Sequence, residues 1–522
     1  MTSNFTLRLK IGIITLSAIL FVQTGFSQTA EQLEALDAYY AKAMQEWNIP
    51  GMAIAIVSGD EIVFSKGYGY ADIEKELPVT NNTLFAIASN SKAFTTSALA
   101  QLVDQKKISW EDRVTDYLPY FATYSPYVTE EFTIADLLCH RSGLKTFSGD
   151  LLWYGTDLTP EEIITSSQYL EPIYGFREHF GYSNINYLAA GMVIEAVTDT
   201  GWAEYVSHHF LKPLGMERTL TSTTQISSTN NVAVPYFDED GVNIELEWMN
   251  WDNIAPAGAL ISSVNDYSKW IMLVNSRGNL NGKLYFSDNQ FEEMTTPHIN
   301  HKLSSFSREH SPTKHFSGYG LGFTLNDYHG YKVLSHGGGY DGMISKSCFV
   351  PEKKLGFIIL TNNLNWLPGA LMYKTLDVIL DDNTEGEDWS ALYLVFKKKS
   401  DNEKAKKLAE SDSLRGKLGQ LSHELKDYTG TYTDKMYGDV VVWEVEGSLN
   451  FKMVRTQIFK AQLNHWNLET FTFRFNTNLS SLPEGKLWFT LDKNGKIAGL
   501  KIDVPNPDFF FTEFDFKKQN EK

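Results

Sequence analysis

The chain has 522 residues, of which 43% are hydrophobic and 21% are charged. This composition excludes a disordered chain, a collagen-like repeat and a coiled coil, and it leaves ample apolar material for a large core. A net charge of -18 repels phosphate backbones and anionic membrane surfaces, so nucleic acid is not an expected partner.

The first 27 residues have the pattern of a signal peptide, assigned to 1–27. Arg8 and Lys10 give a positive start, the apolar stretch Ile11–Val22 is too short to span a bilayer, and Ser27 lies at the expected cleavage position. No cysteine stands at that position, and no later apolar run is long enough for a membrane helix. We therefore expect an exported protein, periplasmic or secreted, with no stable membrane anchor.

Residues 28–385 have the pattern of one α+β domain. Leu33–Trp47 has helical spacing, and the apolar run Met52–Val57 with its return at Glu61–Ser65 predicts a β-hairpin. The segment that follows is mostly helical. Further strands are predicted at Val333–Ser335, Lys346–Val350 and Gly356–Leu360. Strands at both ends of a helical middle predict a sheet built from the two ends of the domain.

The two cysteines, Cys139 and Cys348, both lie in apolar surroundings. They could pair in an oxidising compartment, but a chain of this length needs no disulfide. Two buried free thiols are the favoured interpretation.

The composition changes after Leu380, and residues 386–425 are predicted to be a linker. The segment 397–418 is charged and has helical spacing but few core residues. From Tyr428 the apolar residues recur with a period of two.

Residues 426–522 are predicted to form a small all-β domain of barrel or sandwich type. Asn494-Gly495 is a strong hairpin signal between two of its strands. The predicted strands include Val440–Trp443, Leu449–Met453, Thr470–Phe475 and Lys486–Leu491.

Two common hydrolase motifs, G-x-S-x-G and H-E-x-x-H, are absent, so another nucleophile arrangement is sought. Ser-x-x-Lys occurs at Ser89/Lys92 and at Ser142/Lys145. Ser89 precedes a segment with helical spacing, 93–103, whereas Ser142 precedes a glycine in a predicted loop.

On a helix, residues three apart share a face, which would bring the Lys92 ammonium within reach of the Ser89 hydroxyl. Burial and the positive end of the helix would both lower the pKa of the lysine, so that it could accept the serine proton. The alternative is an N-cap serine with a surface lysine one turn later, which the pattern alone favours.

Two further motifs bear on this choice. Tyr182 is the only tyrosine followed two positions later by asparagine, Asn184, in a loop before a helical segment. A phenol beside a lysine can carry a proton and a carboxamide can orient a carbonyl, although a buried structural tyrosine is the commoner case. His336 precedes three glycines at a predicted strand end, where a substrate backbone could approach closely.

Together and in this order, these motifs resemble those of the serine β-lactamase and penicillin-binding-protein superfamily, specifically its class C, esterase and D-aminopeptidase branch. The motifs are Ser89-Asn90-Ser91-Lys92, Tyr182-Ser183-Asn184 and His336-Gly337-Gly338, with further likeness in Phe85–Ala88, Leu137–Leu144, Pro256–Leu260 and Tyr319–Gly322. The resemblance implies a β-lactamase/transpeptidase-like α+β fold, an antiparallel sheet with a helical subdomain, followed by a lipocalin-like all-β barrel.

The resemblance also implies roles for individual residues. Ser89 would be the nucleophile, with Lys92 and Tyr182 as the proton-transfer pair. The substrate contacts would be Asn184, His336 and Gly338, and the oxyanion hole would be formed by the backbone N–H groups of Ser89 and Gly339.

One departure bears on the substrate. Class C β-lactamases carry Lys-Thr-Gly or a close variant at the third motif, which offers a cation and a hydroxyl to a carboxylate. Here His336 is largely neutral at pH 7 on its ordinary pKa, and Gly337 has no hydroxyl. Carboxylate recognition is therefore not expected to follow the family pattern.

We predict a serine hydrolase that forms an acyl-enzyme with an ester, an amide or a short peptide, including peptides with D-amino acids. The alternatives are a β-lactamase or D,D-carboxypeptidase and, from another class, a non-catalytic ligand- or peptidoglycan-binding protein. The sequence contains no metal-ligand cluster or phosphate loop, so no metal or cofactor is expected. The tail carries none of the motifs, and we expect it to fold separately and to shape substrate access.

Overall fold

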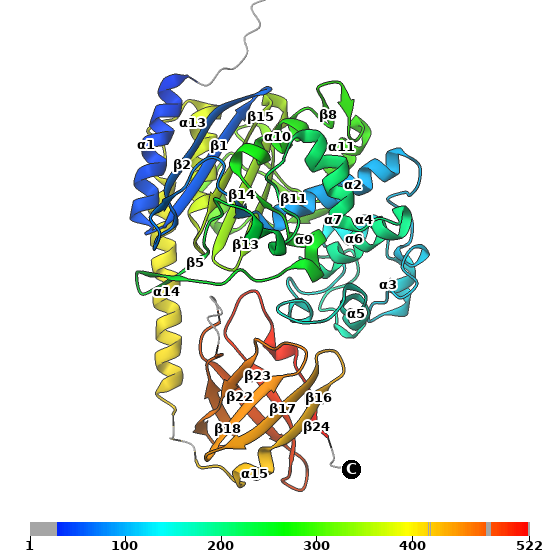
Figure 1. Cartoon of the computed structure of the whole chain (residues 1–522), viewed down its shortest axis with the longest axis vertical. Coiled ribbons are helices and arrows are strands. Elements are labelled where there is room, and N and C mark those ends of the chain that lie inside the picture. The colour runs from blue at the N-terminus through cyan, green and yellow to red at the C-terminus, as the bar shows by residue number, and fades with distance from the viewer. Residues whose placement is uncertain (1–28, 416, 418, 477–481, 520–522) are drawn as a thin grey trace, which may run out of the picture.

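The structure, a computed structural model, describes residues 29–519 apart from 416, 418 and 477–481. The predicted signal peptide lies outside the described residues. An α+β domain, a long helix and a β-barrel follow one another along the chain (Figure 1). Within the described ranges, every helix is too short or too polar to cross a membrane.

A nine-stranded antiparallel sheet forms the centre of the α+β domain, as the sequence predicts. Its strands are, in spatial order, β10 (Ile299–His301), β11 (Ser317–Tyr319), β12 (Thr324–Tyr328), β13 (Tyr331–Tyr340), β14 (Met343–Val350), β15 (Leu355–Thr361), β1 (Gly51–Ser58), β2 (Glu61–Asp72) and β3 (Leu77–Pro78). The predicted hairpin is confirmed as β1 and β2. Because β1 lies between β2 and β15 and is buried almost throughout, its sequence is a continuous apolar run.

The first and last helices of the α+β domain cover one face of the sheet. These are α1 (Ala30–Glu46) and α13 (Leu367–Asp381), whose apolar residues pack on β1, β14 and β15 (Figure 1). The predicted helix 33–47 begins earlier, because Thr29 and Gln32 form a capping box that satisfies the first backbone N–H groups.

The opposite face of the sheet carries the helical subdomain. Its helices are α2 (Ser91–Asp104), α3 (Pro126–Glu131), α4 (Ile134–Cys139), α5 (Pro160–Ser166), α6 (Asn184–Thr198), α7 (Trp202–Val206), α8 (Lys212–Leu214), α9 (Ala255–Gly258), α10 (Val264–Asn275) and α11 (Asp288–Met294). Three short hairpins or strand pairs lie among them: β4 (Phe85–Ala86) with β7 (Ile261–Ser262), β5 (Tyr236–Glu239) with β6 (Val242–Glu245), and β8 (Asn279–Leu280) with β9 (Lys283–Leu284). The short helix α12 (Ser305–His310) instead packs through Phe306 against Trp389, on the side of α1 and α13. The two cysteines, in α4 and β14, are buried and free, as favoured from the sequence.

The glycines after His336 lie inside a strand rather than at a strand end, which corrects the sequence-based expectation. β13 continues to Tyr340, and Gly338 pairs with Ser345 of β14. Glycine is a weak strand former, so the local sequence predicts an ending here. The antiparallel ladder with β14 extends the strand past this point.

Helix α14 (Trp389–Asp412) occupies much of the segment predicted as a linker and runs beside the barrel (Figure 1). Its first turn is anchored in the α+β domain, where the Trp389 indole donates to Asp377 at 2.7 Å. The rest of the helix is largely exposed, which explains its charged composition.

A nearly closed, nine-stranded antiparallel barrel follows, preceded by α15 (Leu425–Tyr428). Its strands are β16 (Gly430–Asp434), β17 (Gly438–Val445), β18 (Ser448–Met453), β19 (Lys460–Gln462), β20 (Asn464–Asn467), β21 (Thr470–Phe473), β22 (Gly485–Leu491), β23 (Ile497–Asp503) and β24 (Phe516–Lys518). The hairpin predicted at Asn494-Gly495 is confirmed between β22 and β23, where Gly495 has a φ of 77°.

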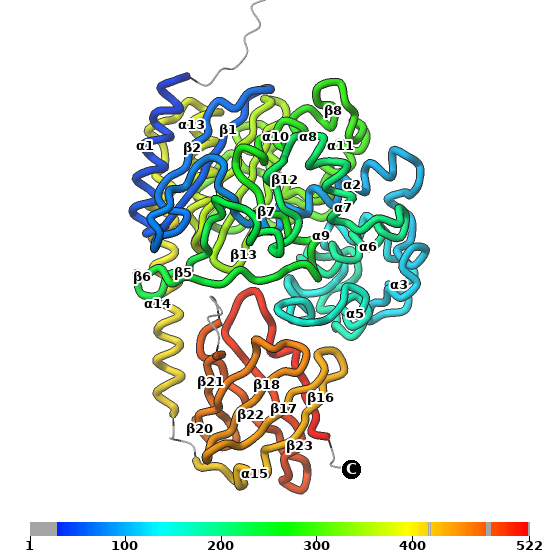
Figure 2. The backbone as a smooth tube through the Cα atoms, in the orientation of Figure 1, coloured from blue at the N-terminus to red at the C-terminus, as the bar shows by residue number. Residues whose placement is uncertain are grey.

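Aromatic residues join the barrel to the α+β domain. The segment 505–510 reaches up from the barrel toward the larger domain (Figure 2). The Tyr154 ring lies 4.3 Å from that of Phe509 and 6.3 Å from that of Phe459, measured between centroids. Arg455 adds ion pairs with Asp157 and Glu162. The barrel therefore contacts the α+β domain directly through its loops, in addition to being connected to it by α14.

Candidate active site

Ser89 lies in a single 3-10 turn, η1 (Ala88–Asn90), immediately before α2, and not on the α-helix itself. Ala88 adopts a left-handed φ of 45°, a conformation that costs free energy for a residue with a side chain. Strand β14 holds this turn in place, since the Asn90 amide donates to Ser345 at 2.8 Å and accepts from Ser347 at 2.5 Å. Ser89, itself half-buried, is thus presented on a rigid support.

Lys92 is fully buried on the first turn of α2, and its Nζ lies 3.1 Å from the Ser89 Oγ. The same ammonium donates to Asn184 Oδ1 at 2.7 Å and to the carbonyl of Ala257 at 2.8 Å. The structure therefore brings Ser89 and Lys92 together as the sequence predicts, and it does not fit the alternative of a surface lysine.

Burial holds the pKa of Lys92 well below its ordinary value, because the charged form loses its hydration. The carboxylate of Asp150 acts in the opposite direction and favours the ammonium. A lysine held in this way can take up a proton from a neighbouring hydroxyl near neutral pH.

Tyr182 lies on the other side of the nucleophile. Its phenol is hydrogen-bonded to the Ser89 side chain, but burial outweighs this contact and raises the phenol's pKa well above its ordinary value. The Lys92 Nζ lies 4.8 Å from the centroid of the tyrosine ring. A neutral phenol that is hydrogen-bonded to the serine can exchange a proton with it, and the lysine lies close to the same ring.

His140 fixes the position of Tyr182, a role that the sequence alone did not reveal. The two rings stack with centroids 4.1 Å apart, and the His140 Nδ1 accepts from the backbone N–H of Ser183 at 3.1 Å. His140 ends α4 in the left-handed conformation. Its burial and the nearby Lys92 lower its pKa well below the ordinary value, so it stays neutral.

Asn184, predicted to contact the substrate, has both ends of its carboxamide engaged inside the protein. Its Oδ1 accepts from Lys92, and its Nδ2 donates to Asp150 Oδ2 at 2.7 Å. Asp150 carries no recognisable motif and was missed by the sequence reasoning. An acidic residue between glycine and a run of large apolar residues, Leu151–Tyr154, is the signal that could have indicated a buried carboxylate.

His336 points into the site from β13, where its Nε2 accepts from the Tyr319 hydroxyl at 2.8 Å. Its Nδ1 lies 2.6 Å from the carbonyl oxygen of Gly337, so this nitrogen carries the proton. Burial lowers the pKa of His336 to about 3, and the ring is therefore neutral at pH 7. His336 offers no cation to a substrate, in agreement with the expectation from the sequence.

The three glycines of β13 differ in their surroundings. Gly337 and Gly339 are exposed, whereas Gly338 is buried against the turn that carries Ser89. A Cβ on Gly338 would lie 2.2 Å from the carbonyl oxygen of Ile87. Position 338 therefore requires a glycine because β13 approaches η1 closely at this point.

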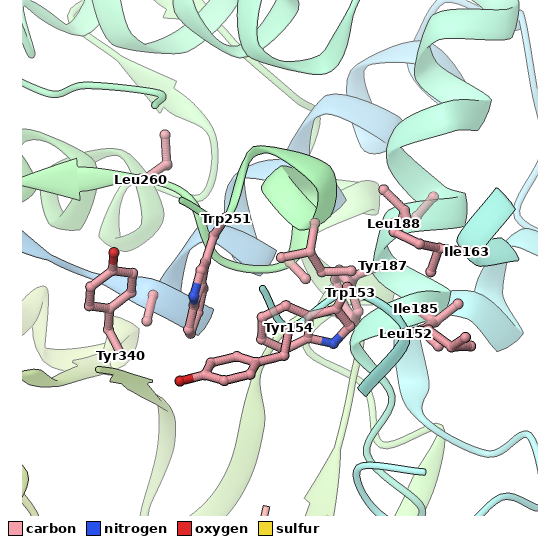
Figure 3. Packing of buried hydrophobic residues seen from close by; sticks show 14 of the residues in the cluster. Leu152, Trp153, Tyr154, Ile163, Ile185, Tyr187, Leu188, Trp251, Leu260 and Tyr340 are labelled. Carbon is pink, nitrogen blue, oxygen red and sulfur yellow. The ribbon is translucent and has the colours of Figure 1, made fainter. Parts of the chain in front are cut away.

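An aromatic wall continues from β13 toward the barrel. It consists of Trp153, Tyr154, Trp251 and Tyr340, which lie side by side in Figure 3. Trp251 lies between Trp153 and Tyr340, with ring centroids 5.0 and 4.6 Å away. The wall joins the strand that carries Gly339 to the segment that carries Asp150.

The lowered pKa of Lys92 predicts a specific dependence of stability on pH. Between the folded-state pKa and about 10.4, its ordinary value, the unfolded chain holds a proton that the folded chain lacks. The free energy of unfolding should therefore rise with pH across this window, by up to about 1.4 kcal/mol per pH unit from this one group. Lys92→Met should remove that part of the slope.

Thermal unfolding of wild type and Lys92→Met at pH 7, 8.5 and 10 measures the effect. Lys398→Met, at an exposed position of α14, is the control and should keep the wild-type slope. Equal slopes in wild type and Lys92→Met would contradict a pKa of Lys92 that burial lowers in the folded state.

Comparisons with known proteins agree with this geometry. A profile of the family described as Beta-lactamase matches residues 36–379, and one described as a domain of unknown function, DUF3471, matches 415–518. The chain is 28% identical over 373 residues to "Unguisins hydrolase ungD" of Aspergillus violaceofuscus, covering 67% of this chain and 66% of that protein. It is 28% identical over 365 residues to "Protein flp" of Staphylococcus aureus, covering 67% of each chain.

The fold is similar to the solved structure of the octameric penicillin-binding protein homologue from Pyrococcus abyssi. The TM-score is 0.61 at 23% sequence identity, and the match covers 93% of this chain and 99% of that one. At this identity the likeness concerns the fold alone. The family profile spans most of the chain, with Ser89, Lys92, Tyr182 and the glycines of β13 inside it. This chain belongs to the Beta-lactamase family, within the serine β-lactamase and penicillin-binding-protein superfamily.

Proposed function

We propose that this protein is an exported serine hydrolase that forms an acyl-enzyme at Ser89. The observation that carries the proposal is the 3.1 Å contact between the Ser89 Oγ and a fully buried Lys92. In the proposed reaction, the Ser89 Oγ attacks the substrate carbonyl while its proton passes to Lys92. The tetrahedral oxyanion is stabilised by the backbone N–H groups of Ser89 and Gly339.

Collapse of the intermediate expels an alcohol or amine, which receives the proton through Tyr182. Water then attacks the acyl-enzyme, the proton of the water passes back through the same pair, and the Ser89 Oγ leaves as a hydroxyl. The atoms balance as the addition of one water across one ester or amide bond.

Within the family, we place the chain in the class C, esterase and D-aminopeptidase branch. The tyrosine motif at Tyr182 supports this assignment, as does a relative that is named a hydrolase. The N-terminal pattern at 1–27 supports export, and a mature protein that begins near Gln28 when recovered from a secreting host would test it.

The preferred substrates are esters, amides and short peptides, with β-lactams and cell-wall peptides that present a carboxylate as the second class. His336 supports this order, because both ring nitrogens are engaged inside the protein and the ring is neutral. A purely non-catalytic binding protein is disfavoured, since a buried lysine beside a serine costs folding free energy that ligand binding does not require.

Hydrolysis rates across a panel of p-nitrophenyl esters, D-amino-acid amides and a chromogenic cephalosporin test the proposal. We expect turnover of esters or amides with a higher kcat/KM than for the cephalosporin, and no turnover by Ser89→Ala. Ser142→Ala, at the second Ser-x-x-Lys, is the control and should keep full activity. Hydrolysis that survives in Ser89→Ala would refute the assignment.

A further inference from the structure

Asp150 lies behind the proposed proton-transfer pair and is not used in the reaction as described. It begins the short turn η3 (Asp150–Leu152) and is 3% exposed. Its Oδ2 accepts from Asn184, whose other end accepts from Lys92, both at 2.7 Å. A single carboxamide thus connects a buried carboxylate to the buried lysine.

The donors and acceptors from Asp150 through Asn184 to Lys92 set the orientation of the Asn184 carboxamide. In the structure Asn184 turns its Oδ1 to the Lys92 Nζ and its Nδ2 to Asp150, which is the orientation that an ammonium, able only to donate, and a carboxylate, able only to accept, require. If Asp150 no longer accepted from Asn184, the carboxamide would be free to rotate and Lys92 would lose a fixed partner. The carbonyl of Ala257 would remain as an acceptor for Lys92, so Asp150 supplies one of two supports that orient the lysine toward Ser89.

The barrel holds the segment from which Asp150 projects. Glu513, at the end of η9 (Phe511–Glu513), accepts from the Ser148 hydroxyl at 2.6 Å and from the backbone N–H of Gly149 at 3.0 Å. The Tyr437 hydroxyl donates to the same carboxylate at 2.7 Å and fixes it within the barrel.

The same segment also supports Tyr182. The backbone N–H of Phe147 donates to the carbonyl of Tyr182 at 2.8 Å, and the Thr146 hydroxyl accepts from its N–H at 3.1 Å. A shift of residues 146–150 would therefore move Asp150 and Tyr182 together.

We propose that Asp150 is a positioning residue, which holds Asn184 against Lys92, and that Glu513 of the barrel in turn holds Asp150 in place. This inference rests on the proposed function, in which Lys92 activates Ser89. It makes the competence of the site depend on the docked barrel, although the barrel supplies no group that touches the reacting atoms.

The charges around this chain set the expected response to pH. Burial raises the pKa of Asp150 to about 7, and its charge favours the ammonium of Lys92. The other titratable groups that face these two residues are His140, His336, Tyr182 and Tyr187 around Lys92, and Glu513 and Tyr437 around Asp150. Both histidines are neutral at pH 7, so the carboxylate form of Asp150, which prevails above its pKa of about 7, is the charge that acts most directly on the lysine.

The first test is the pH profile of kcat/KM for Asp150→Asn, a variant of the same shape without the charge. The acid limb reports protonation of the free enzyme's base. Without the carboxylate, Lys92 gives up its proton more readily, so the limb should move to lower pH by about one unit. The position of the limb does not depend on how much of the variant is folded.

If Asp150→Asn is too slow for steady-state assays, the rate of fluorophosphonate labelling of Ser89 against pH gives the same limb. A lower rate with an unmoved limb would show that Asp150 has only a structural role, and would overturn the proposal. Ser89→Ala distinguishes failure of the proposed function from failure of this inference. If Ser89→Ala remains active, the proposed function itself is wrong.

The second test is a double-mutant cycle between Glu513→Gln and Asp150→Asn in the full-length protein. If Glu513 acts through Asp150, Glu513→Gln should lower kcat/KM about tenfold in wild type and much less in the Asp150→Asn background. Arg455→Gln, which removes the ion pairs that Arg455 of the barrel makes with Asp157 and Glu162, is the matched control and should add its effect independently. Full additivity between Asp150 and Glu513 would contradict the coupling.

Discussion

Lys92→Ala is expected to lower kcat/KM by about 10³- to 10⁴-fold, because it removes the base that takes the Ser89 proton. Ser89 and Tyr182 would remain in place but would have no acceptor at 3.1 Å. The double variant Lys92→Ala/Tyr182→Phe should lose about as much as Lys92→Ala alone, since residues that act as a unit are strongly non-additive.

Steady-state kinetics with the best ester or amide substrate measure both losses. Lys145→Ala is the matched control, because Lys145 belongs to the second Ser-x-x-Lys and lies exposed over the Phe510 ring. It should keep wild-type activity. Independent, multiplicative losses from Lys92→Ala and Tyr182→Phe would argue against a shared proton relay.

Gly338→Ala is expected to lower kcat/KM by on the order of 10²-fold, through displacement of the turn that carries Ser89. The new Cβ would lie 2.2 Å from the carbonyl oxygen of Ile87 and 2.3 Å from the Ser345 Oγ. The serine side chain can rotate, but the backbone carbonyl cannot, so β13 or η1 must move. The midpoint of thermal unfolding should fall as well.

Gly337→Ala is the neighbouring control, since the nearest atom to a Cβ there is the Ser345 carbonyl oxygen at 4.0 Å. It should retain most of the activity and stability. Equal losses at the two positions would mean that the glycines serve the flexibility of the strand and not its close approach to η1.

The sequence predicted the parts of the fold that follow from periodicity. The hairpin of β1 and β2 has an apolar strand bounded by turn residues, and the barrel hairpin at Asn494-Gly495 has a turn that demands a positive φ. Both are local patterns. The course of β13 through three glycines could not be predicted locally, because pairing with β14 sustains it.

The sequence predicted only those residues of the candidate site that belong to a short motif with a fixed spacing. Ser89 and Lys92 are three apart, and their contact follows from the local turn and helix. Asp150 and Glu513 are brought to the site by tertiary packing, and a single carboxylate in a loop carries no spacing signal. The role of His140 depends likewise on ring stacking across the chain, which no periodicity encodes.

The contacts between the barrel and the α+β domain could not be predicted from the hydrophobic pattern of the sequence either. Alternation along a strand predicts which residues face the barrel interior, but Phe509 and Phe459 lie outside the strands. Their contacts with Tyr154 depend on how two separately patterned units meet.

The most direct test of the central claim, that Ser89 is the activated nucleophile, is intact-mass analysis after reaction with a fluorophosphonate probe. The account predicts one adduct per chain, mapping to the peptide that contains Ser89, absent from Ser89→Ala and formed far more slowly in Lys92→Ala. An adduct at any other serine, or an adduct that persists in Ser89→Ala, would contradict it.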